Sequence, residues 1–331
     1  MRKVDVCPGT LKEGFSTYSP ACIKNVFGGH RVHHVLAYDS SNNEAIVEKF
    51  IENRKRISIS GVQEKLSLVV RKKALVLTRE DEQGTYILKP IPRDLLNVNE
   101  VPANEHLTMQ IARQLYHIET AENALVFFRD GRPAYLTKRF DVETDGRKVG
   151  VEDFASLAGK SSHQDGVNFK YDYSYEKLGG LIRQFIPAWR VEIEKYFRLV
   201  LFNYLFSNGD AHLKNFSIIE TRIGDYKLSP AYDLISTQLH VHDTPFALSK
   251  GLFEEDHGSE RYKNTGKPGI DDFRLFGRRI GLKAHRMDKL LAPYRTVPPD
   301  LDRLIDNSFL SAKSKRAYRL LYNTRRNTLL K

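Results

Sequence analysis

The sequence predicts an α+β protein of two lobes, with a strand-rich N-terminal lobe over residues 1–140 and a helical C-terminal lobe over residues 141–331. Residues 60–140 consist mostly of short apolar or β-branched runs, separated by charged or glycine-containing turns, which is typical of a sheet. From about residue 150, apolar residues recur at helical spacing instead. A length of 331 residues is enough for two lobes of ordinary domain size.

Five strands and one helix are expected in the first lobe. The helix begins near Pro102 and Asn104, and the turn between the last two strands contains Asp130 and Gly131. The apolar face of the helix is formed by Leu107, Ile111, Leu115 and Ile118. The strands are expected at Lys65–Val70, Ala74–Thr78, Thr85–Lys89, Ala124–Phe128 and Ala134–Thr137.

The second lobe contains a helix that leads directly into a polar loop. The apolar face of this helix is formed by Ile193, Phe197, Val200, Leu201, Tyr204 and Leu205. The helix runs into Ser207–Asp210, where Gly209 is expected to end it. Two short strands are expected to follow at Phe216–Ile219 and Tyr226–Leu228. The sequence from about residue 284 predicts a helical and basic tail.

Composition limits the class of protein. Hydrophobic residues make up 41% and charged residues 28%, which is typical of a globular chain. No run of 18 apolar residues is present and Met1–Cys7 lacks the apolar core of a signal peptide, so a cytoplasmic protein is expected. Two cysteines, Cys7 and Cys22, cannot complete a zinc site, so they are expected to be buried or merely tolerated thiols.

The chain is basic, since 52 Lys and Arg against 41 Asp and Glu give a net charge of +11. This favours an anionic partner such as a nucleotide, RNA, DNA or an acidic protein surface. The basic residues are dispersed along the chain, so a solvated basic surface is the alternative.

The segment Asn208–Asn215 carries the strongest chemical signal. Asp210 is followed five residues later by Asn215, the spacing of a protein-kinase catalytic loop, in which the aspartate takes the proton of the attacking hydroxyl and the asparagine holds magnesium. Asp233 follows two short strands, where a kinase has its other metal-binding carboxylate. The alternative is a pair of surface carboxylates and a turn-forming asparagine, which the helix–loop–strands–aspartate order disfavours.

Two lysines could neutralise phosphate charge. Lys214, between the two expected metal ligands, could act on the γ-phosphate in the transition state. Lys89 ends a strand and could reach the α- and β-phosphates, with Glu105 of the following helix orienting it as an ion pair. An ordinary lysine at a sheet edge is an equally good interpretation of Lys89 taken alone.

Two further segments are weaker candidates. Ser58–Lys65 precedes the first strand and could cradle phosphates, but its single glycine makes a plain loop the better interpretation from physics alone. Arg139-Phe140-Asp141 stands where a hinge would contact adenine, and the alternative is an ordinary strand end.

Together these segments resemble the HipA family of serine/threonine kinases, which are toxins of bacterial toxin–antitoxin systems. The resemblance covers about residues 57–240 and rests on the motifs Ser58–Lys65, Ile87–Pro90, Asn104-Glu105, Lys138–Asp141, Glu152–Phe154, Asn208–Asn215 and Pro230–Leu234. It implies a bilobal protein-kinase-like fold, with Asp210 as the catalytic base and Asn215 and Asp233 as magnesium ligands. It also implies that ATP is bound by Ser60, Gly61, Val62, Gln63, Glu64, Lys65, Lys89, Lys138, Arg139, Phe140, His212 and Tyr232.

The chain departs from full-length HipA proteins in two ways. Only 57 residues precede Ser58, where HipA proteins carry a further subdomain, so the chain looks like HipT, the shorter toxin of three-part systems. The loop also carries two serines, Ser58 and Ser60, and the resemblance implies that they are autophosphorylated. A phosphate would add about two negative charges beside those of ATP, so it should prevent nucleotide binding.

The resemblance also implies partners. These are a small HipS-like protein that resembles the missing subdomain, a helix-turn-helix HipB-like antitoxin that binds DNA, and a protein substrate, expected to be an aminoacyl-tRNA synthetase. Contact with DNA would be only indirect, through the antitoxin. Two alternatives stay open: a non-catalytic pseudokinase in a DNA-bound repressor complex, and a small-molecule kinase of the aminoglycoside type.

Overall fold

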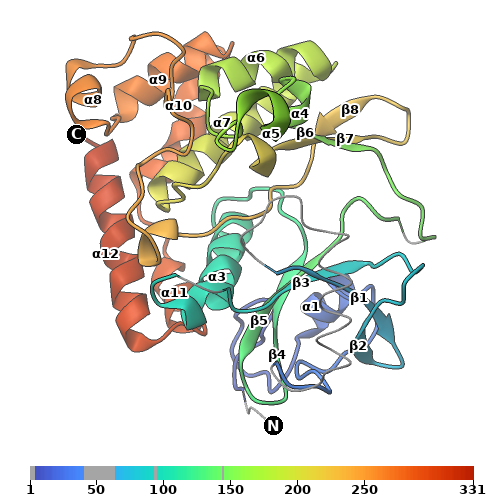
Figure 1. Cartoon of the computed structure of the whole chain (residues 1–331). Helices are drawn as coiled ribbons and strands as arrows, with labels where there is room; N and C mark the ends of the chain where they lie inside the picture. Colours follow the sequence, from blue (N-terminus) through green and yellow to red (C-terminus); the bar gives the residue numbers. More distant parts are fainter. Residues whose placement is uncertain (1–3, 41–63, 93–94, 144) are drawn as a thin grey trace. The chain divides into compact units, whose positions relative to one another are not determined.

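The computed structural model describes residues 4–331 except 41–63, 93–94 and 144. Their internal contacts divide the chain into two compact units. The first unit consists of Met1–Gln110, Ala121–Arg147 and Asp302–Lys315, and the second of Ile111–Thr120, Lys148–Leu301 and Arg316–Lys331. Most strands lie in the first half of the chain and most helices in the second, so the predicted α+β class is confirmed (Figure 1).

A five-stranded antiparallel sheet organises the first unit, in the order β2-β1-β3-β5-β4. Its strands are β1 (Leu66–Arg71), β2 (Ala74–Leu77), β3 (Tyr86–Lys89), β4 (Asn123–Phe127) and β5 (Pro133–Lys138). All five predicted strands are therefore present. The register pairs Leu88 of β3 with Leu136 of β5, and both side chains are fully buried. Because side chains alternate along a strand, this register fixes the face on which each residue of β3 lies.

Residues N-terminal to the sheet complete its core. Helix α1 (Pro20–Asn25) begins after Ser19, whose side chain accepts a hydrogen bond from the amide of Cys22. Cys7, Cys22 and Phe27 pack in one cluster with the apolar residues of the sheet. Both thiols are free and buried, as predicted.

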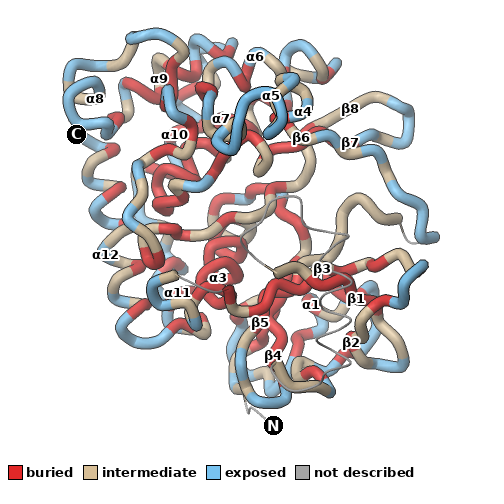
Figure 2. Tube along the Cα trace, viewed as in Figure 1, coloured by how far each residue is buried: buried red, intermediate tan, exposed pale blue. Residues whose placement is uncertain are grey.

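Helix α3 (Val101–Gln114) follows a 3-10 turn, η1 (Val98–Glu100), and is almost entirely buried in its N-terminal part (Figure 2). The expectation that this helix would extend to Ile118 is wrong. His117 adopts a left-handed conformation, with φ of 50°, and the amide of Ile118 donates to the carbonyl of Ala112 at 3.0 Å. This hydrogen-bond pattern ends a helix, and it turns the apolar Ile118 out of the helical register.

The second unit is built around helices with a three-stranded sheet, β6-β7-β8. Its strands are β6 (Val151–Asp153), β7 (Ser217–Glu220) and β8 (Tyr226–Leu228). Its helices before β7 are α4 (Phe154–Leu157), α5 (Ser162–Asp165), α6 (Tyr175–Phe185), α7 (Trp189–Leu205) and the 3-10 turn η2 (Leu213–Asn215). After β8 come the 3-10 turn η3 (Thr237–Leu239), then α8 (Glu260–Thr265), α9 (Ile270–Arg279) and α10 (Ala284–Arg295).

Two helices end the chain: α11 (Leu301–Asp306) and α12 (Ala312–Leu329). They confirm the prediction of a helical tail. In the part of the chain that the structure describes, no helix is long and apolar enough to cross a membrane.

Helix α7 forms the core of the second unit. Tyr196 and Phe197 are fully buried, and the ring of Phe197 stacks on Phe276 of α9 at a centroid distance of 5.9 Å. The expectation that Gly209 ends α7 is wrong, because the helix ends at Leu205 and Ser207 takes the left-handed conformation, with φ of 56°. Ser207 thereby starts the loop two residues earlier than predicted.

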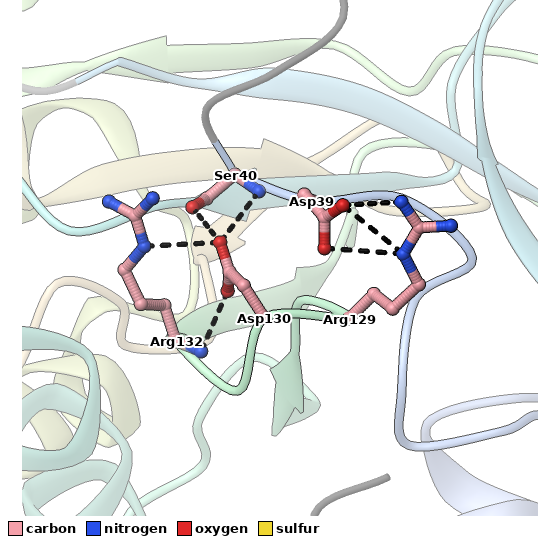
Figure 3. Close-up of polar contacts among 5 residues, drawn as sticks. All are labelled: Asp39, Ser40, Arg129, Asp130 and Arg132. Atoms are coloured by element: carbon pink, nitrogen blue, oxygen red, sulfur yellow. Dashed lines mark hydrogen bonds and ion pairs between the residues drawn. The ribbon is translucent and has the colours of Figure 1, made fainter.

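The segment just before residues 41–63 is attached to the turn after β4. Asp39 forms an ion pair with Arg129, and Ser40 hydrogen-bonds to Asp130 through both its amide and its hydroxyl (Figure 3). Arg132 donates to the same carboxylate from across the turn. The polar turn predicted at Asp130 therefore also orients the chain at residues 39 and 40.

Candidate active site

Asp210 lies on a loop that the end of helix α7 holds in place. The side-chain amide of Asn208 donates to Oδ1 of Asn203 at 3.0 Å, so the loop is attached to the last turn of α7. The backbone amide of Asp210 in turn donates to Oδ1 of Asn208 at 3.3 Å. The carboxylate of Asp210 is 55% exposed, so a substrate can reach it.

Tyr171 contacts the carboxylate of Asp210. Its hydroxyl donates to Oδ1 of Asp210 at 2.8 Å, and its ring packs edge-on against His212. Burial, together with the nearby negative charge of Asp210, raises the pKa of Tyr171, so its hydroxyl stays protonated and acts as a donor at neutral pH. The hydrogen bond from Tyr171 engages Oδ1 of Asp210 and leaves Oδ2 available in a fixed orientation. A carboxylate held in this way can accept a proton from a substrate.

Asn215 and Asp233 are neighbours, as the predicted metal site requires. Nδ2 of Asn215 donates to Oδ2 of Asp233 at 3.3 Å, while its Oδ1 accepts from the amide of His212 at 3.2 Å. Asp233 has a φ of 55°, a left-handed conformation that costs energy in a residue other than glycine and is often found at functional sites.

The donor set suits magnesium bound together with a substrate. Among the described residues, no group of three His, Cys, Asp or Glu side chains could hold a metal ion. Asn215 and Asp233 offer one amide oxygen and one carboxylate, both hard oxygen ligands. Magnesium in phosphate-transferring enzymes is commonly held by one or two such side chains plus substrate phosphates and water, so the residues present fit this ion.

His212 and Tyr232 are packed beside these residues. Burial lowers the pKa of His212 to about 4, so its ring is neutral at physiological pH. The Tyr232 hydroxyl donates to the carbonyl of Lys214 at 2.9 Å and lies 2.5 Å from Oγ of Ser217. Tyr232 therefore connects the turn that carries Asp233 to the end of the loop that carries Asp210.

Lys214, which directly precedes the expected metal ligand Asn215 in sequence, is paired with a carboxylate. Its Nζ forms an ion pair with Oδ2 of Asp153 at 2.7 Å, and both side chains are partly exposed. Asp153 is also the N-cap of helix α4, since its Oδ1 accepts from the amide of Ser156 at 3.0 Å. The carboxylate thus fixes the direction in which the lysine extends.

In the first unit, Lys89 and Glu105 form the predicted ion pair. Nζ of Lys89 lies 2.7 Å from Oε1 of Glu105, and both side chains are almost fully buried. The ammonium also lies over the ring of Tyr135, 5.4 Å from its centroid. Strand β3 and helix α3 are therefore joined at the position the sequence indicated.

The remaining predicted residues are less informative. Lys138 ends β5, and Arg139 is bound to Asp141 through its Nε at 2.9 Å, so the guanidinium is engaged within its own turn. Glu64 and Lys65 are half-buried ahead of β1. The predicted residues outside the described part of the chain are Ser58, Ser60, Gly61, Val62 and Gln63.

The sequence did not reveal Tyr171 as a site residue, and it indicated Asp153 only as part of the motif Glu152–Phe154, without a role. Tyr171 is 39 positions from Asp210 and Asp153 is 61 positions from Lys214, so no local spacing connects them. Asp153 does precede the apolar residues Phe154 and Ala155, and an aspartate in this place is a signal for a helix cap. Such a signal identifies the cap and gives no indication of the ion pair.

Solved structures with a similar fold include two bacterial proteins. One is the HipA chain of a complex from Shewanella oneidensis with HipB and operator DNA, with a TM-score of 0.63 and 20% identity over 88% of this chain and 72% of that one. The other is the proinflammatory kinase CtkA of Helicobacter pylori, with a TM-score of 0.50 and 15% identity over 79% of this chain and 93% of that one. The fold is therefore of the protein-kinase-like class.

Sequence comparison defines the family. Residues 57–298 match the HipA-like C-terminal domain. A Haemophilus influenzae protein named "Putative kinase" is 31% identical over 73% of this chain and 72% of its own length. The HipA serine/threonine-protein kinase toxin of Shewanella oneidensis is 26% identical over 57% of this chain and 45% of its own length. The chain belongs to the family of proteins with a HipA-like C-terminal domain.

Proposed function

We propose that this protein is a magnesium- and ATP-dependent serine/threonine protein kinase that acts as a toxin. The observation that carries the proposal is the arrangement in the second unit. An exposed aspartate, Asp210, is oriented by Tyr171, and the Asn215–Asp233 pair follows on the same loop and the adjoining turn. Positioned carboxylates and an oriented base are the main requirements of phosphoryl transfer.

Each residue has a role in this proposal. Asp210 takes the proton from the serine or threonine hydroxyl of the substrate, through the carboxylate oxygen that Tyr171 leaves available. Asn215 and Asp233 would hold magnesium, which when bound neutralises charge on the β- and γ-phosphates. Lys214, directed by Asp153, would add positive charge near the transferred group.

The nucleotide contacts follow from the family resemblance. Lys89, oriented by Glu105, is proposed to bind the α- and β-phosphates. The other proposed contacts are Ser60, Gly61, Val62, Gln63, Glu64, Lys65, Lys138, Arg139, Phe140, His212 and Tyr232. The neutral ring of His212 suits a site that receives a nucleotide by packing and hydrogen bonding.

A substitution of Asp210 tests the proposal. Asp210→Asn should abolish transfer of labelled phosphate from ATP to a protein pool, because the amide cannot accept the proton. Asp225→Asn is a matched control, since Asp225 lies in the β7–β8 turn, bound to Thr221. Transfer by Asp210→Asn at the wild-type rate would contradict the proposal. Transfer by the wild type to small alcohols and not to proteins would indicate a small-molecule kinase.

We also propose that Ser58 and Ser60 are autophosphorylated. Two phosphates would carry up to about four negative charges and repel the triphosphate. Mass spectrometry should find phosphate on one or both serines of the wild type and none in Asp210→Asn. Equal ATP affinity in Ser58→Asp/Ser60→Asp and in the wild type would show that these serines do not regulate binding.

The toxin role needs a target and a neutralising partner. The proposed target is an aminoacyl-tRNA synthetase, tested by phosphoproteomics after brief expression of the wild type and of Asp210→Asn. Phosphate gained only by the protein itself would contradict a toxin role through this route. The Shewanella protein is bound to HipB and DNA, which supports a HipB-like antitoxin that contacts DNA on behalf of this chain.

A small HipS-like partner would fit the edge of the first sheet. Strand β2 is an outer strand with the apolar sequence Ala74-Leu75-Val76-Leu77, and an outer strand of this kind is normally covered. Such a protein would make the chain a HipT-like toxin. Co-purification with the neighbouring gene products tests the idea, and a monodisperse monomer in their presence would contradict it.

A further inference from the structure

A small polar cluster lies under the loop that carries Asp210. It consists of Ser207, Gly209, Thr237 and Asp243, and we name it the loop anchor. Oγ1 of Thr237 accepts a hydrogen bond from the amide of Gly209 at 2.8 Å and lies 2.9 Å from the carbonyl of Ser207. Oδ2 of Asp243 is within hydrogen-bonding distance of the same hydroxyl. Thr237 itself is 8% exposed, so water cannot easily substitute for these contacts.

The protonation state of Asp243 decides which contacts of the Thr237 hydroxyl can be hydrogen bonds. The Thr237 hydroxyl has one proton and two acceptor positions. If Asp243 is ionised, it can only accept, so the hydroxyl must donate to it and cannot also donate to the Ser207 carbonyl. If Asp243 is protonated, it donates to Thr237, the hydroxyl donates to Ser207, and the Gly209 amide uses the remaining lone pair. All three contacts of the Thr237 hydroxyl, with Gly209, Ser207 and Asp243, can therefore be hydrogen bonds only when Asp243 is protonated.

The surroundings of Asp243 also favour its protonated form. Oδ1 of Asp243 is buried and accepts no hydrogen bond from the described residues, a situation far more costly for a carboxylate than for a neutral acid. Desolvation raises the pKa of Asp243. The charged groups that act on it are Arg325 of α12, which favours ionisation, and Asp210, which opposes it. The guanidinium of Arg325 is engaged elsewhere, since its Nε donates to Oγ of Ser207 at 3.2 Å.

Gly209 allows the close approach. A Cβ atom at this position would lie 2.3 Å from Oδ2 of Asp243 and 2.6 Å from the backbone carbonyl of Thr244. The φ of Gly209 is not in the left-handed region, so the glycine is required by space and not by backbone conformation. The loop next to Asp210 therefore rests directly on Asp243 and Thr237.

We propose that Thr237 and a protonated Asp243 are positioning residues that hold the Gly209-Asp210 backbone in the arrangement needed for proton transfer. The proposal rests on the proposed kinase function, because it assigns a consequence to the placement of Asp210. Neither residue touches the substrate. Both act through the amide of Gly209, which is one peptide unit away from Asp210.

Substitutions at both positions test the proposal. Thr237→Val keeps the shape but removes the hydroxyl, and Asp243→Ala removes the donor. Both should lower kcat about tenfold or more, since small displacements of a reacting group cost this much, while KM for ATP stays within about twofold. Thr237→Ser and Asp243→Asn should retain most of kcat, because the serine hydroxyl and the asparagine amide reproduce the hydrogen bonds of threonine and of the protonated acid. An Asp243→Asn variant as impaired as Asp243→Ala would show that Asp243 acts as a carboxylate, and would overturn the proposal.

A second measurement does not depend on catalysis. Hydrogen exchange of the Gly209 amide should become about tenfold faster in Thr237→Val, while Thr221→Val, which removes a similar hydroxyl–carboxylate contact in the β7–β8 turn, should leave it unchanged. Unchanged exchange at Gly209 in Thr237→Val would overturn the loop anchor even if the protein is a kinase. A wild type that transfers no phosphate, with faster exchange in the variant, would instead overturn the kinase function and leave the anchor in place.

Discussion

Two lysine–carboxylate pairs of equal length, one in each unit, differ in their surroundings. Lys89–Glu105 and Lys214–Asp153 each have a nitrogen–oxygen distance of 2.7 Å. The side chains of the first pair are 6% and 4% exposed, and those of the second are 30% and 22% exposed. Charge attraction is screened by water in the second pair, whereas in the first pair both ions have lost their hydration. The distance is therefore a poor guide to energy, and burial decides what each pair does.

The largest effect is expected from breaking the buried pair. Glu105→Ala should lower the free energy of unfolding by about 3–5 kcal/mol, because the Lys89 ammonium then stays buried without this carboxylate. Urea unfolding monitored by circular dichroism gives the value. As a control, the apolar double variant Lys89→Met/Glu105→Leu should regain most of the lost stability while lacking the lysine that we propose binds the phosphates. A loss below 1 kcal/mol in Glu105→Ala would contradict the burial argument.

The two units also contain matching buried histidines, which predict a dependence on pH. Burial lowers the pKa of His106 in the first unit and of His212 in the second, each to about 4. The unfolded chain therefore binds protons from about pH 6.5 downward, while the folded protein does so only near pH 4. Above about pH 6.5 each neutral ring makes its full contribution to the free energy of unfolding. This contribution is lost as the pH falls toward 4, by roughly 3 kcal/mol per histidine at most.

Unfolding measured at pH 7 and pH 4.5 checks this expectation. His212→Gln should show a smaller decrease between the two pH values than the wild type, as should His106→Gln. His257→Gln is the control, because its ring is partly exposed. An equal decrease in all three variants and the wild type would mean that other groups cause the acid sensitivity.

The comparison of the two pairs also shows what sequence can reveal. Lys89 ends a short apolar strand and Glu105 lies in the first turns of a helix, so local patterns predicted the element that carries each residue. A known type of ion pair then predicted that the two side chains meet. The Lys214–Asp153 pair joins residues 61 positions apart through the antiparallel pairing of β6 with β7. Nothing local encodes that pairing, because β6 has only three residues and was not predicted as a strand.

The ends of helices were the other weak point. Helix α3 stops at Gln114 and α7 at Leu205, where His117 and Ser207 adopt left-handed conformations. Glycine is the usual sequence signal for such a turn, so a histidine and a serine give no warning. Tertiary contacts stabilise the conformation of Ser207, which is bound by Thr237 and Arg325.

A smaller effect, on rate, is expected from Tyr171. Tyr171→Phe should lower kcat about fivefold with little change in KM for ATP, because the carboxylate of Asp210 is half-exposed and loses only its orienting bond. Tyr226→Phe, in strand β8, is the control. A higher kcat in Tyr171→Phe would show instead that the tyrosine hydroxyl occupies the place of the acceptor hydroxyl.

The smallest effect belongs to the exposed pair. Asp153→Asn removes the charge but leaves an oxygen that can still cap helix α4 through the amide of Ser156, so stability should fall by only about 0.5 kcal/mol. Asp153→Ala removes the cap as well and should cost about 1 kcal/mol more. Urea unfolding of the two variants separates the two contributions. Added salt should narrow the difference between wild type and Asp153→Asn and should leave the difference between Asn and Ala unchanged, because salt screens the ion pair and has little effect on a capping hydrogen bond. A loss of 3 kcal/mol in Asp153→Asn would mean that this pair behaves like the buried one, and the distinction between the two units would fail.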